Sequence, residues 1–369
     1  MKKQLGYLAG LLSMVALPVF GAVNINTATQ SELEAVKGLG PAKARAIIAH
    51  REIMTQNNLK VGDRIKMTVN RRAADFVIVG AQKSASTALA ESLRQHPSIF
   101  MPAGETHYFR DPEFKTSTPE DLRALFAGSR GASRRGIKCP DYLGQEPCAQ
   151  RIADELGMVD IIAVLRDPVE RAVSNYYWLM RWGQLPVEPV DVGMWRLLRG
   201  EYSGLRQADE ILEYGLYGKH LKRFLRTFGE NRVVVLLDSD LRADADEARR
   251  GVYRFLGVDG DFQPTIRRRS RNEGVYPLRR LKVLRLRNRF VYDNGDPQTG
   301  RLRRPTRVDQ ALLNASVVLA DRYLVAPWLG NEKPQLPPDV RAALREYYDE
   351  DVRMTETLTG RDLSAWRAR

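Results

Sequence analysis

Residues 76–89 of the chain read FVIVGAQKSASTAL, and the fold prediction starts from this stretch. Four strand-forming residues lead into Gly80, a short polar loop carries Lys83, and a segment rich in Ala and Leu predicts a helix. Such a strand–loop–helix unit can bind phosphate or sulfate, because backbone N–H groups of the loop and of the helix start converge on the anion. Gly80 permits a sharp turn and a close approach to the ligand.

Polar side chains of the loop add to these backbone donors. Lys83 supplies a mobile full charge, and Ser84, Ser86 and Thr87 supply hydroxyl groups. The triphosphatase pattern GxxxxGK[ST] does not fit, because the lysine follows Gly80 by three residues and no second glycine precedes it. By itself the loop fits an ordinary strand-to-helix turn equally well, so the interpretation depends on the downstream sequence.

From residue 75 onward the pattern alternates between strand and helix. Short apolar runs at 76–79, 160–165 and 232–237 are bounded by polar residues, as buried parallel strands are. Amphipathic helices are predicted at 86–95, 168–181, 210–227, 244–255 and 338–358. We therefore expect an α/β domain over 75–369, a three-layer parallel sheet of the P-loop nucleotide-binding type, with ligands at the carboxyl ends of the strands.

Composition favours an anionic partner. The 369 residues carry a net charge of +13 from 58 Lys and Arg, and 43% are hydrophobic, enough to fill a core. Residues 267–307 hold 14 Lys and Arg against three acids, an excess of 11. This basic run is either a solvated face or the lining for an anionic cofactor or acceptor.

The two cysteines, Cys139 and Cys148, do not form a disulfide framework, although a single bridge fits an exported chain. No CxxC or Cys/His spacing of the zinc-binding kind occurs. We therefore expect no metal site.

The first 22 residues read as a secretory signal. Lys2 and Lys3 precede an apolar stretch at 5–17, and small residues follow at Gly21 and Ala22. The apolar stretch is too short to span a bilayer comfortably, so no transmembrane helix is expected beyond this signal-like segment.

Residues 23–52, VNINTATQSELEAVKGLGPAKARAIIAHRE, resemble the helix-hairpin-helix unit of competence-type DNA-binding proteins. Thr29 caps a first helix, a hairpin follows at 38–40, and Pro41 opens a second helix. The resemblance implies a small α-helical hairpin whose N–H groups contact a DNA phosphate, weakly because one hairpin reaches few phosphates. A structural or vestigial appendage is the alternative. Residues 53–74 read as a linker, with one short strand at 64–69.

A second motif, VLRDPVERAVSNYYW at 164–178, decides between the readings of the loop. A buried strand ends at Leu165, Arg166 opens the turn into a helix, and Ser174 follows Arg166 by eight residues on that helix. In this order the two motifs resemble sulfotransferases that use 3′-phosphoadenosine 5′-phosphosulfate (PAPS) as donor. The resemblance implies that Arg166 and Ser174 bind the 3′-phosphate, for which a guanidinium and a hydroxyl are suited. The alternative is a salt bridge from Arg166 to Asp167 or Glu170.

The same resemblance assigns the loop to the donor's 5′-phosphosulfate. The donor-binding residues on this reading are Gln82, Lys83, Ser84, Ala85, Ser86 and Thr87. The resemblance covers roughly residues 75–260, with weaker similarity to the end of the chain.

Two further fragments resemble the carbohydrate, heparan-type sulfotransferases. SIFMPAGETHYFRD at 98–111 is similar to their KExHFF segment and places the general base at Glu105, although Gly104 stands where a lysine is common. His107 is the rival base, because an imidazole titrates nearer neutrality. GIKCPDYL at 136–143 places a lysine that faces the transferring group at Lys138, whose plain alternative is a surface lysine at a strand end.

Together these matches imply a mechanism and a substrate class. Glu105 takes the proton of a carbohydrate hydroxyl or amine as it attacks sulfur in line, while Lys83 and Lys138 stabilise the charge of the transferring group. A nucleotide-dependent kinase is the alternative enzyme, and a periplasmic DNA-uptake protein is the alternative supported by residues 1–52. Localisation stays open, because the signal indicates export to the periplasm or beyond whereas PAPS is made in the cytoplasm.

Overall fold

The computed structural model describes residues 28–36, 44, 47, 48, 51, 72–129, 131–205, 207–265, 274–291 and 308–367. By its contacts the chain divides into two compact units, Met1–Asn70 and Arg71–Arg369. Among the described residues, no helix combines the length and the apolar character needed to cross a bilayer.

In the smaller unit, α2 (Gln30–Glu34) begins at a capping box. The hydroxyl oxygen of Thr29 accepts from the backbone N–H of Glu32, and the Glu32 carboxylate accepts from the backbone N–H of Thr29 at 2.7 Å. Ala28, Leu33 and Ala44 form a small apolar cluster. The predicted cap at Thr29 is confirmed. The signal-like segment 1–22, the hairpin at 38–40, Pro41 and the strand at 64–69 lie outside the described residues.

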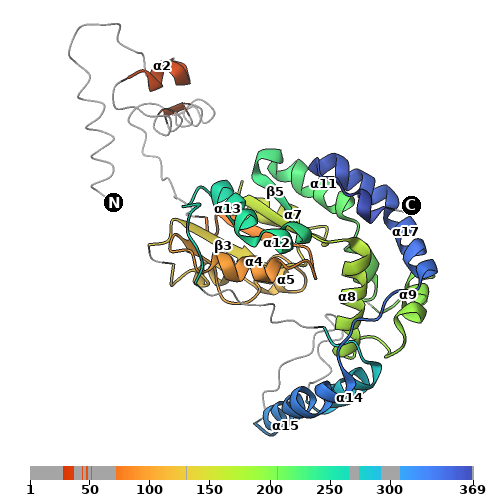
Figure 1. Ribbon diagram of the computed structural model, residues 1–369. Helices are drawn as coiled ribbons and strands as arrows, with labels where there is room; N and C mark the ends of the chain where they lie inside the picture. The colour runs from red at the N-terminus through yellow and green to blue at the C-terminus, as the bar shows by residue number, and fades with distance from the viewer. Residues whose placement is uncertain are drawn as a thin grey trace, which may run out of the picture. The chain divides into compact units, whose positions relative to one another are not determined.

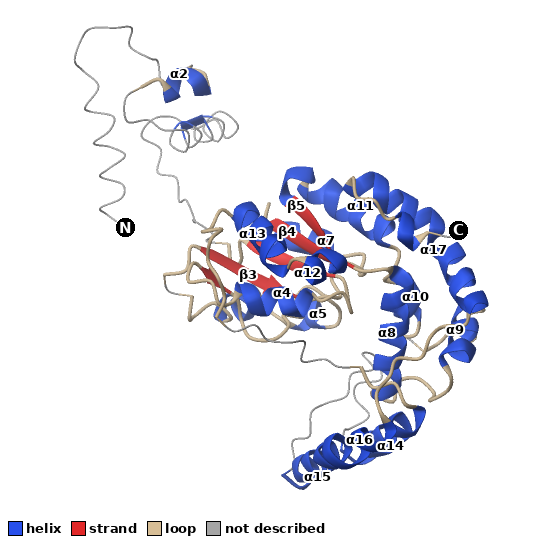
Figure 2. Ribbon diagram, viewed as in Figure 1, coloured by secondary structure: helices blue, strands red, loops and turns tan. Residues whose placement is uncertain are grey.

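The larger unit is built on five parallel strands in the order β2-β3-β1-β4-β5 (Figure 2). They are β1 (Phe76–Gly80), β2 (Ile99–Phe100), β3 (Arg134–Lys138), β4 (Asp160–Leu165) and β5 (Val233–Leu237). Phe76 pairs with Gly136 on one side and with Asp160 on the other, so β1 is the central strand. Every side chain of β1 is buried, as its continuous apolar run predicts.

Helices cover both faces of this sheet (Figure 1). Val77 and Val79 point to one face, into a core shared with α7, α8 and α11. Phe76 and Ile78 point to the other face, against α4 and α13. The period of two along each strand separates the two cores. The predicted three-layer α/β architecture is therefore confirmed.

The remaining helices follow the chain in this order: α4 (Ser86–Leu93), α5 (Glu113–Thr116), α6 (Pro119–Ala124), α7 (Cys148–Leu156), α8 (Pro168–Arg181), α9 (Val190–Leu198), α10 (Asp209–Glu213), α11 (Tyr217–Phe228), α12 (Asp238–Ala243), α13 (Ala245–Leu256), α14 (Leu278–Val291), α15 (Val308–Ala320), α16 (Ala326–Leu329) and α17 (Pro338–Thr359). Short 3-10 turns lie at Glu230–Arg232 and Ser364–Trp366, and a π-helical turn at Asp321–Val325 joins α15 to α16.

The ends of α8 agree with the prediction because the start signal is local. The carboxylate of Asp167 accepts from the N–H groups of Val169 and Glu170, at 2.8 and 3.1 Å, and Pro168 occupies the first turn. Helix α13 begins in the same way after its cap, Asp244. Helix α4 ends at Leu93, two residues before the predicted end.

The single helix predicted over 210–227 is wrong. The chain instead forms α10 and α11, with a break at Gly215 and Leu216. A Cβ atom on Gly215 would lie 2.8 Å from the ring of Tyr348 of α17, and the Tyr348 hydroxyl donates to the carbonyl of Leu212 at 3.0 Å. Close packing of α17 therefore sets the break, which local sequence does not reveal.

The cysteines also differ from the bridge considered for an exported chain. Cys139 and Cys148 are both buried thiols and form no disulfide with each other. Burial is the largest influence on Cys148 and raises the pKa of its thiol to about 12.

The division into two units generates a prediction: residues 71–369 expressed alone keep the melting temperature of the larger unit in the full chain. Every described residue of both sheet cores lies within that range, so we expect both cores to form without residues 1–70. Thermal unfolding of the two proteins should agree within about 2–4 °C, which corresponds to roughly 1 kcal/mol for a domain of this size. An insoluble product would contradict this independence.

Candidate active site

The loop after β1 has a backbone that local sequence alone would not favour. Gly80 has φ +153°, and a Cβ atom there would lie 2.8 Å from the carbonyl oxygen of Pro140. Lys83 and Ala85 both adopt the left-handed region, with φ of 62° and 64°, which is costly for residues other than glycine. Ala85 is also the N-cap of α4, and no side chain caps that helix. An anion could therefore take the position of the missing cap.

Two hydroxyl groups of the loop donate hydrogen bonds to carbonyl groups of the same loop. The Ser84 hydroxyl donates to the carbonyl of Gln82 at 3.3 Å, and the Ser86 hydroxyl donates to the carbonyl of Ala81 at 3.5 Å. Both serines are buried, whereas Thr87 is exposed at the start of α4. Thr87 is thus the hydroxyl of the loop that solvent can reach most readily.

Lys138 joins the loop to the predicted base. It is the last residue of β3, next to β1, and it is 3% exposed. Its Nζ atom lies 2.7 Å from the hydroxyl oxygen of Thr87 and 2.7 Å from Oε1 of Glu105. A buried ammonium needs such partners, because an unpaired charge in the interior is strongly unfavourable. Three sequence-predicted site residues therefore meet at the carboxyl ends of β1 and β3.

The segment that carries Glu105 is fixed to the sheet just beyond this carboxylate. The backbone N–H of Thr106 donates to the carbonyl of Lys138 at 2.9 Å. The buried hydroxyl of Tyr142 donates to the carbonyl of Thr106. The Glu105 side chain stays 37% exposed, so its second oxygen can be reached from solvent while the first contacts Lys138.

Arg166 reaches the same loop from β4. Its Nη1 atom donates to the carbonyl of Lys83 at 3.2 Å. The guanidinium lies 3.6 Å from Asp238 and 3.7 Å from Glu170, so the alternative pairing with Glu170 is present in part. Glu170 also accepts from Lys333 and from Arg341, and so it balances several cations at once.

The ammonium of Lys83 lies over an aromatic ring of α8. Nζ is 4.2 Å from the centroid of the Trp178 ring, within the range of a cation–π contact. Burial is the largest influence on this group, and the positive charges of Arg181 and Arg166 act in the same direction. Together they lower the pKa of Lys83 to about 8. Binding of an anion here would favour the charged form of the lysine.

Ser174 lies on α8 and is half-buried. Trp178 follows it by four residues, so both occupy the same face of the helix. Trp178 ends the motif at 164–178, and the motif alone predicts no role for it. The helical spacing from Ser174 is the signal that could have identified it.

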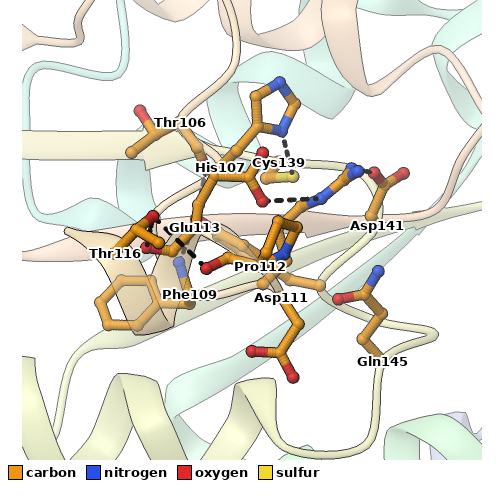
Figure 3. Close-up of polar contacts among 12 residues, drawn as sticks. Thr106, His107, Phe109, Asp111, Pro112, Glu113, Thr116, Cys139, Asp141 and Gln145 are labelled. Atoms are coloured by element: carbon orange, nitrogen blue, oxygen red, sulfur yellow. Dashed lines mark hydrogen bonds and ion pairs between the residues drawn. The ribbon is translucent and has the colours of Figure 1, made fainter. Parts of the chain in front are cut away.

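Two residues for which the sequence predicts no role, Asp141 and Arg110, hold Gln82 in place. Its amide donates to Oδ1 of Asp141 at 2.7 Å, and Arg110 forms an ion pair with the other carboxylate oxygen. Figure 3 shows the imidazole of His107 directed at the thiol of Cys139, with Asp141 nearby; the His107 Nδ1 and Cys139 Sγ atoms are 3.5 Å apart.

Among the described residues, His107, Cys139 and Asp141 are the one cluster with the donor types of a metal site. The charge of Asp141 is already balanced by Arg110, so we interpret the cluster as part of the wall that supports the loop.

Two parts of the chain match protein-family models. Residues 157–273 match the family model of the sulfotransferase domain. Residues 20–77 match the family model of the helix-hairpin-helix motif. The first match includes Arg166 and Ser174, and the second includes the capping box at Thr29.

Curated relatives are found among enzymes named for heparan sulfate. The chain is similar to heparan sulfate glucosamine 3-O-sulfotransferase 3B1 of Mus musculus, with 29% identity over 192 residues, 51% of this chain and 47% of the relative. It is also similar to the bifunctional heparan sulfate N-deacetylase/N-sulfotransferase 4 of Mus musculus, with 25% identity over 205 residues, 50% of this chain and 22% of the relative. The aligned region thus spans about half, or less, of these relatives.

A solved structure extends the similarity over most of the larger unit. The crystal structure of a sulfotransferase from Alicyclobacillus acidocaldarius superposes with a TM-score of 0.54 and 25% identity. The superposition covers 79% of this chain and 98% of that chain.

The environment of Lys83 generates a prediction about stability and pH. Because its folded-state pKa of about 8 is below the ordinary value of 10.5, the unfolded state binds more protons between these pH values, and stability should rise there with pH. Lys83→Met removes this dependence. The free energy of unfolding of the wild type should therefore gain about 2 kcal/mol relative to Lys83→Met between about pH 8 and 9.5.

Urea unfolding at several pH values in this range gives the free energy of unfolding of both proteins. Because all other titrating groups are common to the two proteins, their contributions cancel in the difference. A constant difference would mean that Lys83 is not desolvated in the folded protein.

Proposed function

The chain contains a sulfotransferase domain, and we propose that it transfers a sulfuryl group from PAPS to a hydroxyl or amine group of a carbohydrate acceptor. The observation that carries this proposal is the position of Lys138, whose ammonium contacts both Thr87 at the start of α4 and the exposed carboxylate of Glu105. An uncapped helix start, a buried cation and an exposed carboxylate thus adjoin one another at the carboxyl edge of the sheet, where parallel α/β sheets bind ligands.

The residues around the loop fit a nucleotide donor with two anionic ends. On the loop side, the uncapped start of α4 and Lys83 would hold the 5′-phosphosulfate, with Gln82 to Thr87 forming the cradle. Arg166 and Ser174 would hold the 3′-phosphate. PAPS, when bound, supplies the activated sulfuryl group.

Glu105 is proposed as the general base. Its carboxylate is reachable from solvent, and the hydrogen bond from Lys138 fixes its orientation. It would take the proton from the acceptor hydroxyl or amine as that group attacks sulfur, while the bond from sulfur to the 5′-phosphate oxygen breaks and adenosine 3′,5′-bisphosphate leaves. Lys138 and Lys83 would stabilise the negative charge that develops on the group in transfer.

His107 stays the rival base. Its Nδ1 atom lies 3.5 Å from the thiol sulfur of Cys139, on the wall beside the loop. The fixed contact of Glu105 with Lys138 favours Glu105.

A carbohydrate acceptor is supported by the relatives that are named for heparan sulfate. Transfer of labelled sulfate from PAPS to a panel of glycans tests the proposal directly. Label appearing in a glycan supports it. Transfer of phosphate from ATP with Mg²⁺, and no transfer from PAPS, would identify a kinase instead.

Weak DNA binding by the smaller unit is a second proposal, which rests on the helix-hairpin-helix match at residues 20–77. Few phosphates are within reach of one hairpin, so the affinity should fall steeply with salt. Comparing duplex binding by the full chain and by residues 71–369 separates this activity from the sulfotransferase domain.

Donor binding generates a prediction for Arg166. Adenosine 3′,5′-bisphosphate should raise the melting temperature, because a ligand that binds only the folded state stabilises it. Arg166→Ala should weaken the affinity by about tenfold to a hundredfold, since a hydrogen bond to a charged group contributes roughly 1.5–3 kcal/mol. Arg226→Ala, an exposed arginine of α11, is the matched control and should keep the full shift.

AMP lacks the 3′-phosphate and should give a smaller shift with the wild type. If AMP and the bisphosphate stabilise the protein equally, Arg166 and Ser174 do not hold a 3′-phosphate.

The assignment of the base generates a prediction for Glu105. Glu105→Gln keeps an amide oxygen for Lys138 but cannot accept the proton, so turnover should fall about a hundredfold or more while bisphosphate affinity is kept. Glu120→Gln, an exposed glutamate of α6, is the control and should be fully active. An active Glu105→Gln together with an inactive His107→Ala would exchange the two roles.

A further inference from the structure

A helical hairpin near the end of the chain is distinct from the sheet and its covering helices. Helix α14 packs beside α15, and the π-helical turn and α16 extend α15 (Figure 1). We call Leu278–Val291 and residues 308–329 together the C-terminal hairpin. No residue of the proposed active site lies in it.

One face of α14 anchors the hairpin to the domain. Leu281 and Leu284 are buried, and the side-chain amide of Asn288 donates to the carbonyl of Arg181 at the end of α8 at 2.9 Å. An ion pair also joins α14 to the π-helical turn. Nε and Nη2 of Arg280 donate to the two carboxylate oxygens of Asp321, at 3.0 and 2.8 Å. The hairpin is therefore a fixed part of the larger unit and packs on the helix that carries Ser174 and Trp178.

The hairpin exposes large apolar side chains along more than three helical turns. Trp328 is 90% exposed, Leu324 68%, Leu312 64% and Tyr323 63%. Further exposed large apolar residues of the hairpin are Val283, Leu286, Leu313, Val318, Leu319 and Leu329. Residues 308–329 contain three charged residues, Asp309, Asp321 and Arg322, and Asp321 is bound by Arg280. A helical segment with this many exposed large apolar side chains is a candidate interaction site.

Cations accompany this apolar surface. Helix α14 contains six Lys and Arg and no acid over Leu278–Val291. Arg279 and Lys282 are exposed, and with Val283 and Leu286 they occupy the face opposite to the buried Leu281 and Leu284. Apolar and cationic groups thus share one exposed surface, as in helices that bind the interface of an anionic bilayer.

We propose that the C-terminal hairpin docks the protein on the surface of an anionic phospholipid membrane. Leu312, Leu319, Leu324 and Trp328 would enter the boundary between head groups and acyl chains, where tryptophan is favoured. Arg279 and Lys282 would contact lipid phosphates. Among the described residues no helix is both long and apolar enough to cross a bilayer, so the hairpin would lie on the membrane surface.

The charges favour a membrane over a second copy of this chain. A symmetric dimer through this surface would bring the cations of two α14 helices together, and like charges in a partly dehydrated interface are unfavourable. Anionic phosphate groups instead complement Arg279 and Lys282 while the acyl region receives the apolar side chains. The same reasoning makes binding to neutral lipid weaker.

The experiment measures sedimentation of the full chain with vesicles of phosphatidylcholine alone and of phosphatidylcholine with phosphatidylglycerol. We expect preferential binding to the anionic vesicles and a decrease with added salt. Arg279→Glu with Lys282→Glu should reduce the partition coefficient about 25-fold or more, since each cation near the surface contributes roughly a fivefold factor. Leu324→Ser with Trp328→Ser should reduce it at least tenfold.

Matched controls test whether position matters. Lys222→Glu with Arg226→Glu makes the same charge change on exposed positions of α11, and Val192→Ser with Leu205→Ser removes apolar groups that are about 40% exposed elsewhere. Both controls should bind vesicles like the wild type. All variants change exposed side chains, and unchanged melting temperatures confirm that they fold.

Two outcomes would overturn the proposal. In one, hairpin variants bind anionic vesicles as well as the wild type does, so that any membrane contact lies elsewhere in the chain. In the other, no vesicle binding occurs, and sedimentation velocity shows a dimer that Leu324→Ser with Trp328→Ser dissociates. The surface would then be an interface between two copies.

Discussion

The buried ammonium of Lys138 is the constraint on which the rest of the site depends. A cation that is 3% exposed has an unfavourable desolvation energy of several kcal/mol unless partners compensate for it. Its partners, Thr87 and Glu105, come from two segments that are separate in sequence. Satisfying one charge therefore fixes the start of α4, the end of β3 and the Glu105 segment relative to one another.

Positive charge is also concentrated around the loop after β1, where we propose that the donor binds. Arg166, Arg181 and Lys83 lie close enough for the two arginines to lower the pKa of the lysine. Asp238 and Glu170 balance Arg166 only in part, because each also contacts another cation, Arg242 in the case of Asp238. This local excess is relieved by a polyanion and is unfavourable without one.

The features that the sequence predicts well are those with local causes. The apolar run of β1, the cap and proline at the start of α8, and the glycine before the loop each act within a few residues. Strand β3 was missed because its sequence, RRGIK, has no apolar run. It becomes a strand through its neighbours: Arg134 pairs with Asp160 of β4, and the backbone N–H of Arg135 donates to Asp75.

The candidate site divides in the same way. Resemblance named Lys83, Glu105, Lys138, Arg166 and Ser174, because they occur in recognisable motifs. The contacts that support them could not be read from spacing, since Trp178 lies under Lys83 only through the packing of α8 against the loop. Similarly, Asp141 supports Gln82 from 59 residues away. A single sequence thus indicates candidate site residues more readily than the residues that hold them in place.

The basic residues at 267–307 do not all have the same structural role. The sequence left open whether this run is a solvated face or a ligand surface. In the described part of α14, Arg280 turns inward to pair with Asp321, while Arg279 and Lys282 face solvent beside Val283 and Leu286. The inward arginine stabilises the hairpin, whereas a purely solvated face would carry no large apolar groups between its cations. Mixed apolar and cationic character on a rigid helix is better explained by a partner that offers both a hydrocarbon phase and anionic groups.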